Sequence, residues 1–146
     1  MRKPIFVVAA FTALLAGAGE AAAQAYPTRP ITMIVPLGTG GSTDVIARIV
    51  AEGMRATLGQ PVIVENVTGA GGSIGVGRAA RAAPDGYTIN LGQWGTNMAN
   101  GAIYPLQYDI IGDFEPVALI ANQPFLIDSR KTLPAKDLRE DRKSVV

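Results

Sequence analysis

The sequence contains no cysteine and no histidine, and each absence excludes a class of chemistry. Without cysteine, the chain forms no disulfide and has no thiolate nucleophile or thiolate metal ligand. Without histidine, it lacks the commonest general base and the commonest metal ligand. We therefore expect a protein that is not an enzyme, with no metal site and no cofactor.

The sequence also lacks an excess of charge of one sign, since its 13 Lys and Arg residues are nearly balanced by 12 Asp and Glu residues, for a net charge of +1. A nucleic-acid-binding protein needs a basic surface to neutralise phosphates, so no nucleic-acid partner is expected. Glycine, by contrast, is abundant: the 17 glycines cluster, which indicates special backbone geometry at defined places.

The first 25 residues have the pattern of a secretory signal peptide. Arg2 and Lys3 precede an apolar run at residues 5–15, and the segment ends in the A-x-A sequence of residues 23–25. The apolar run is short for a bilayer span, so an uncleaved membrane anchor is the weaker alternative. We expect cleavage after Ala25, no membrane insertion afterwards, and a periplasmic location.

From Tyr26 onward, predicted strands and helices alternate. Strands are predicted at residues 31–35, 62–66, 87–91, 117–120 and 125–127. One helix is predicted to end at residue 58, and a second is predicted at residues 74–83. Ser42 or Thr43 is expected to cap the first helix, and Gly59 to end it. This alternation predicts an α/β fold, with a mostly parallel sheet and flanking helices.

Three glycine-bearing loops follow the first three strands, at residues 37–41, 68–73 and 92–97. In a parallel α/β sheet, these loops share the edge where ligands bind. A glycine loop that leads into a helix presents free backbone N–H groups to an anion, and Ser42, Thr43 and Ser73 add uncharged hydroxyl donors. The alternative is that the glycines only form tight turns. Three loops at one edge favour a site for a carboxylate.

Motifs for other functions are incomplete. Residues 71–75 match G-x-S-x-G, the nucleophile elbow of hydrolases, but no histidine is present to accept the serine proton. No Gly-Lys pair is present for a phosphate-binding P-loop. The carboxylates Asp109, Asp113 and Glu115 fit no metal-binding spacing and are expected to form a solvated turn.

The chain resembles the substrate-binding receptors of tripartite tricarboxylate transporters, also called the Bordetella uptake gene family. The resemblance is carried by short stretches that occur in order along the chain. They are residues 26–31, 35–36, 40–44, 58–66, 69–75, 84–88 and 113–117, and together they extend the likeness from Tyr26 to about Leu138.

The resemblance implies a periplasmic-binding-protein-like fold of type II, of which this chain has the first lobe only. It also implies a receptor that closes on small carboxylates and delivers them to a membrane transporter, and we expect a monomer. The residues that the resemblance assigns to ligand binding are Gly40, Gly41, Ser42, Thr43 and Asp44 in the first loop, Ala70, Gly71, Gly72 and Ser73 in the second, and Thr96 and Asn97 in the third.

The sequence departs from the family pattern after Leu138, where a charged stretch without an apolar stripe replaces the expected helix. The predicted organisation is a signal peptide at residues 1–25, a partial N-terminal lobe at 26–138, and an aberrant tail at 139–146. Two alternatives to a working receptor remain open at this point. One is a non-functional truncated fragment of such a receptor, and the other is an exported hydrolase.

Overall fold

The computed structural model describes residues 26–124, together with residues 132 and 140. The chain divides into two units, residues 1–115 and residues 116–146. The predicted signal peptide, the predicted strand at residues 125–127 and most of the predicted tail lie outside the described residues.

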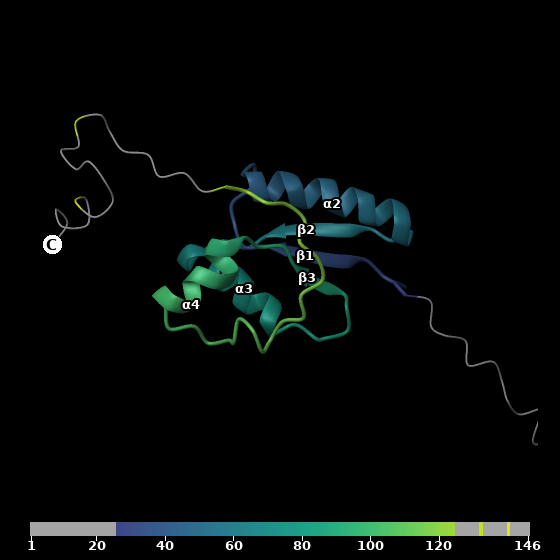
Figure 1. Ribbon diagram of the computed structural model, residues 1–146. Helices are drawn as coiled ribbons and strands as arrows, with labels where there is room; N and C mark the ends of the chain where they lie inside the picture. The colour runs from purple at the N-terminus through teal and green to yellow at the C-terminus, as the bar shows by residue number, and fades with distance from the viewer. Residues whose placement is uncertain (1–25, 125–131, 133–139, 141–146) are drawn as a thin grey trace, which may run out of the picture. The chain divides into compact units, whose positions relative to one another are not determined.

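The first unit contains a three-stranded parallel sheet with the strand order β2-β1-β3 (Figure 1). The central strand β1, Ile31–Val35, pairs with β2, Val62–Asn66, on one side and with β3, Thr88–Asn90, on the other. Parallel neighbours need a crossover connection, which the intervening helices supply. The predicted α/β class with a parallel sheet is confirmed.

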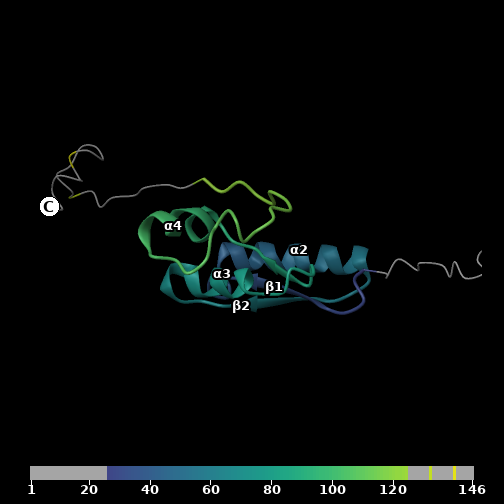
Figure 2. The ribbon, with the colours of Figure 1, turned by 90° about the horizontal axis from the view of Figure 1, so that it is seen from below.

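Helices lie on both faces of the sheet. The long helix α2, Ser42–Leu58, covers one face, and α3, Ser73–Ala80, covers the other (Figures 1 and 2). A short helix, α4, Asn100–Ile103, continues the π-helical turn η2, Gly95–Ala99, near the ends of the strands. No helix in the described part of the chain has both the length and the apolar character to span a membrane.

The core lies between β1 and α2. Met33 and Val35 of β1 pack against Ala47 and Ala51 of α2, and all four are buried. The two alanines stand four residues apart, on one face of the helix, and their small side chains let the helix approach the sheet closely.

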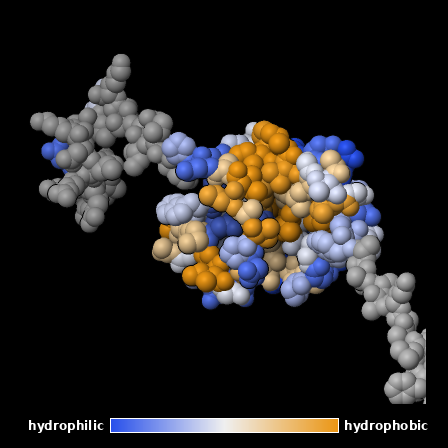
Figure 3. All heavy atoms as spheres, turned by 45° about the vertical axis from the view of Figure 1, so that its right-hand side comes forward, coloured by the Kyte–Doolittle hydropathy of each residue, from blue (hydrophilic) through white to orange (hydrophobic). Residues whose placement is uncertain are grey.

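Not every apolar residue of α2 faces the sheet, since Val45 and Ile49 are 50% and 68% exposed. Each stands two residues from Ala47, about 200° around the helix, and therefore on the side away from the sheet. Ile63 of β2 is also half exposed. Figure 3 shows apolar residues gathered on one face of the protein.

The two ends of α2 differ in how well the sequence predicts them. Gly59 ends the helix at φ 70° and donates its N–H to the carbonyl of Arg55 at 3.0 Å, so the predicted left-handed cap is confirmed. The residue at the N-cap is Gly41, and no side chain caps the helix there. The predicted cap by Ser42 or Thr43 is wrong, because both residues already lie in the first turn.

Two further predictions are wrong. The third glycine loop is short, because helical structure begins at Trp94 and continues to Ile103. Residues 117–120 form no strand, and Val117 and Leu119 are each 89% exposed. Apolar composition alone does not make a strand, because a strand also needs a neighbour to exchange backbone hydrogen bonds.

Candidate functional site

The three glycine loops meet at the carboxyl edge of the sheet. At Gly72 the second loop touches the third loop and the residue that precedes the first: an added Cβ atom would lie 2.6 Å from Cγ2 of Thr96 and 3.0 Å from the carbonyl oxygen of Pro36. Gly72 also has φ 95°, which side chains rarely tolerate. Glycine is therefore required at this point, and it allows Pro36 and the third loop to pack against the second loop.

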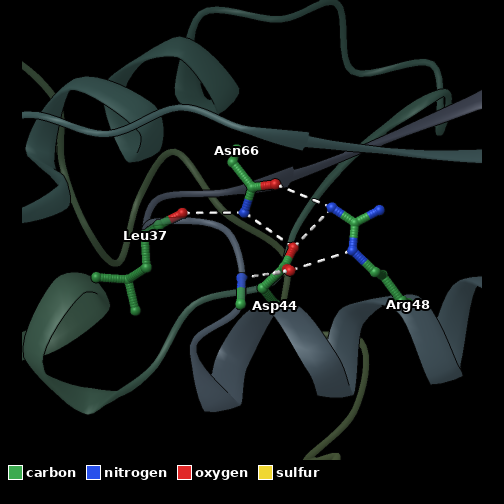
Figure 4. A network of polar contacts seen from close by, with 5 residues as sticks. Leu37, Asp44, Arg48 and Asn66 are labelled. Atoms are coloured by element: carbon green, nitrogen blue, oxygen red, sulfur yellow. Dashed lines mark hydrogen bonds and ion pairs between the residues drawn. The ribbon is translucent and has the colours of Figure 1, made fainter.

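The first loop, between β1 and α2, is held by the buried carboxylate of Asp44 (Figure 4). Its Oδ2 atom accepts the backbone N–H of Gly40 at 2.8 Å and Nε of Arg48 at 3.1 Å. Its Oδ1 atom accepts Nη2 of Arg48 at 3.0 Å and Nδ2 of Asn66 at 3.0 Å. These four donors leave the carboxylate no free capacity for an incoming hydrogen-bond donor.

Asn66 connects this loop to the end of β2. Its Nδ2 atom also donates to the carbonyl of Leu37 at 3.0 Å, and its Oδ1 atom accepts Nη2 of Arg48 at 3.2 Å (Figure 4). Both ends of the first loop are therefore tied to one side-chain network, which consists of Asp44, Arg48 and Asn66.

The same contacts change the acidity of Asp44. The Arg48 guanidinium, followed by the Gly40 amide and the Asn66 amide, lowers the pKa of Asp44 from 3.8 to about 2, against the opposing effect of burial. Asp44 therefore carries a negative charge at neutral pH, and it lies beside a segment predicted to bind anions.

The second loop has an unusual backbone. Four consecutive residues, Gly69, Ala70, Gly71 and Gly72, have positive φ angles of 121°, 46°, 63° and 95°. The resulting turn uses several of its own amides, since Gly72 donates to the carbonyl of Gly69 at 2.9 Å and Ser73 donates to that of Ala70. Among the predicted amide donors of this loop, those of Ala70 and Gly71 remain available to a ligand.

Asn100 of α4 holds the second loop from the other side. Its Nδ2 atom lies 2.8 Å from the carbonyl oxygen of Gly71 and 3.3 Å from Oγ of Ser73. The ring of Tyr104 lies beside Gly71, 3.3 Å from the position of an added Cβ atom. The short helix α4 is thus attached to the second glycine loop through one buried amide and one aromatic ring.

In the third loop, the hydroxyl of Thr96 is already occupied. Its Oγ1 atom accepts the N–H of Gln93 at 3.1 Å and lies 2.8 Å from Oδ1 of Asn97. Thr96 is 1% exposed, so it supports the loops from beneath. Asn97 is half-buried next to it, whereas Trp94 is exposed.

The predicted site residues therefore differ in their access to a ligand. Thr43, Asp44, Gly72 and Thr96 are buried, Ser73 and Asn97 are intermediate, and Gly40, Gly41, Ser42, Ala70 and Gly71 are exposed. The amide of Gly40 is occupied by Asp44. The amides of Gly41, Ser42, Ala70 and Gly71 and the hydroxyl of Ser42 are the exposed groups that make no hydrogen bond within the described part of the chain.

Sequence reasoning missed three residues of the site: Arg48, Asn66 and Asn100. Arg48 was recognisable as the i+4 partner of Asp44 on a predicted helix. Asn66 was placed at a strand end, but its bond to Leu37 spans 29 residues of sequence. No local signal identified Asn100, because its helix was not predicted and its partners lie 27 and 29 residues away.

A groove of about 610 Å³ lies elsewhere, between α4 and the segment that follows it. Its lining includes Met98, Tyr104, Tyr108 and Asp109, and it shares no residue with the predicted carboxylate site. Within residues 26–124, no three acidic side chains gather closely enough to hold a metal ion. The glycine loops are thus the part of the described chain that is best equipped for an anion.

The chain resembles known proteins along most of its length. The family model described as the receptor of the tripartite tricarboxylate transporter family matches residues 46–143. BugT of Bordetella pertussis is 39% identical over 140 residues, which cover 94% of this chain and 43% of BugT.

Two solved structures share the fold. MatC of Rhodopseudomonas palustris, solved with bound malate, has 45% identity and a TM-score of 0.70, over 82% of this chain and 41% of MatC. Another protein of the same organism, solved with adipate, has 34% identity and a TM-score of 0.67, over 82% of this chain and 40% of its own. The chain thus spans about two fifths of the length of the curated relatives and structures that it matches.

Proposed function

The chain belongs to the tripartite tricarboxylate transporter receptor family, and from that premise we propose that it is a solute-binding receptor for small carboxylates. The observation that carries the proposal is the close approach of the second glycine turn, at Gly72, to Pro36 at the start of the first turn, with exposed, unused amides in both turns. Uncharged N–H donors at a helix start suit a carboxylate, which the helix dipole also attracts.

The ligand contacts are assigned to two pairs of residues. Gly41 and Ser42 supply amides and a hydroxyl from the first loop, and Ala70 and Gly71 supply amides from the second. Malate in MatC and adipate in the second relative support a dicarboxylate as the ligand class.

The other predicted site residues have supporting roles. Asp44 orients the first loop through the Gly40 amide, and Thr96 fills the space beneath Gly72. Thr43 is buried in the first turn of α2, Ser73 lies beside Asn100, and Asn97 lies beside Thr96 in the third loop. Gly40 contributes its positive φ angle of 84° to the turn, because its own amide is occupied.

The proposal extends to the setting of the receptor. The signal-peptide pattern of residues 1–25 and the family membership support a periplasmic location and delivery of the ligand to membrane transporter subunits. In this assignment, residues 26–138 form part of the N-terminal lobe and act as a monomer. The surface that closes over the ligand from the other side belongs to the second lobe found in the family.

The test is an NMR titration of the chain from Tyr26 onward, labelled with ¹⁵N, with malate and adipate. We expect saturable shifts of the amide signals of Gly41, Ser42, Ala70 and Gly71 at millimolar ligand. This method detects the weak binding expected when only one side of a ligand is enclosed.

Two matched ligands make the titration specific. Malamide, the neutral diamide of malate, keeps the size of malate but removes its charges, so it should leave these signals in place. Sodium sulfate controls for a general anion effect. The proposal fails if malate moves no amide signal of either loop, or if malamide and malate produce the same shifts.

A further inference from the structure

The proposed carboxylate site lies beside a fixed negative charge. Oδ2 of Asp44 is 2.8 Å from the amide nitrogen of Gly40, which is the immediate neighbour of Gly41 in the chain. One residue step spans about 3.8 Å and a hydrogen bond about 2.9 Å, so a carboxylate bound by the Gly41 amide lies within about 10 Å of Asp44. Two carboxylates at such a separation repel each other, and burial of Asp44 strengthens the repulsion.

Arg48 is placed to cancel this charge. Its guanidinium contacts both oxygens of Asp44, through Nε at 3.1 Å and Nη2 at 3.0 Å. Within the described part of the chain, Arg48 is the cationic residue that forms an ion pair with Asp44. The Asp44 side chain is 2% exposed and that of Arg48 is 52% exposed, so the positive partner lies on the solvent side of the pair.

We propose that Arg48 is a positioning residue whose charge, by neutralising Asp44, permits an anion to bind at the Gly41–Ser42 amides. The inference rests on the proposed function and deepens it. Asp44 shapes the first loop by holding the Gly40 amide, and Arg48 removes the electrostatic penalty that this arrangement imposes on a carboxylate ligand.

The test compares malate affinity in four proteins by NMR titration: the wild type, R48Q, D44N/R48Q and R55Q. Loss of Arg48 alone should weaken malate binding by about tenfold or more, because a buried charge is then left uncompensated. The double variant removes both charges and should bind malate more tightly than R48Q, because the side-chain oxygen that D44N retains can still accept the Gly40 N–H. Arg55 pairs with Glu52 in the last turn of the same helix, so R55Q should not change the affinity.

Two readouts separate charge compensation from a merely structural role. Added salt should reduce the loss seen in R48Q, because salt screens the uncompensated charge. R48K keeps the positive charge and should bind within a few-fold of the wild type. If R48Q does not fold, R48K and D44N/R48Q still test the proposal, since both are expected to bind malate.

The outcomes distinguish the two proposals. Absence of malate binding by the wild type overturns the receptor function and this inference together. If the wild type binds and D44N/R48Q stays as weak as R48Q, or R48K loses binding, Arg48 does not act by neutralising Asp44 and the inference alone is overturned. An R48Q affinity equal to that of the wild type also overturns it.

Discussion

At the scale of single residues, the side chains that matter most at the site are the ones that orient its backbone. Asp44 and Asn66 hold the first loop, and Asn100 holds the second. Each bonds a main-chain atom, Asp44 four residues away and the two asparagines 29 residues away. Polar side chains therefore orient the exposed amides, and in the proposed site these side chains do not contact the ligand.

The acidity of Asp44 predicts how stability depends on pH. In the folded chain its pKa is lowered from 3.8 to about 2, so the unfolded chain binds a proton first as the pH falls. The stabilisation is complete above about pH 4 and is lost as the pH falls toward 2. Urea unfolding of D44N should show a flatter dependence of the free energy of unfolding on pH in this range.

The matched control for D44N is E115Q, which removes an exposed carboxylate outside the network. It should retain the wild-type pH dependence between about pH 4 and pH 2. Equal slopes for D44N and the wild type would contradict the role given to Asp44.

Two glycines in helices predict opposite effects of a single methyl group. An added Cβ atom at Gly75 in α3 would collide with the carbonyl oxygen of Val67 and lie 2.9 Å from Cα of Pro36, whereas Gly53 in α2 has open space. We expect G75A to lower the free energy of unfolding by about 1–3 kcal/mol, because it overpacks the loop contact. G53A should raise it by about 0.5–1 kcal/mol, since alanine favours the helix. Chemical denaturation of both variants measures this, and a G75A protein as stable as the wild type would refute the close contact.

At the scale of elements, the carboxyl ends of three parallel strands bring the three loops together, and short helical turns hold them there. The π-helical turn η2 and α4 place Thr96 beneath Gly72 and Asn100 beside Gly71. This helical segment is therefore the support of the second glycine loop. Its role follows from contacts across about 30 residues of chain.

The variant N100A should loosen that support. It removes the donor to the Gly71 carbonyl, a hydrogen bond worth about 0.5–1.5 kcal/mol to the free energy of unfolding. We also expect faster hydrogen exchange at the amides of Gly72 and Ser73, which are hydrogen-bonded within the turn. Q107A changes an exposed residue in the segment after α4 and serves as the control. Unchanged exchange in N100A would mean that the loop holds its turn without α4.

At the scale of the whole molecule, apolar side chains remain exposed on the described part of the chain. Val45, Ile49 and Ile63 of the first unit are half or more exposed, and so are Val117 and Leu119 of the second. The chain spans about two fifths of the length of its relatives. The second lobe implied by the family would add the contacts that enclose a ligand.

This incomplete enclosure predicts weak affinity. Small-molecule sites bury most of the ligand surface, and one set of loops buries only one side of it. Calorimetry with a panel of di- and tricarboxylates should therefore give dissociation constants in the millimolar range for this chain, weaker than those of full-length MatC measured in parallel. Micromolar or tighter binding by the monomer would show that the loops of this chain suffice.

Local periodicity and backbone preference are enough to predict the α/β alternation, the glycine cap at Gly59 and the glycine loops that follow the parallel strands. The side chains that hold the loops in place depend on tertiary contacts, because Asn66 and Asn100 reach carbonyl oxygens 29 residues away in the sequence. The bond from the Gly40 amide to Asp44 spans only four residues, but the dihedral angles of the turn decide whether it forms. The tertiary structure also decided that residues 117–120 form no strand, since strand formation depends on a neighbouring strand as well as on the segment's own sequence.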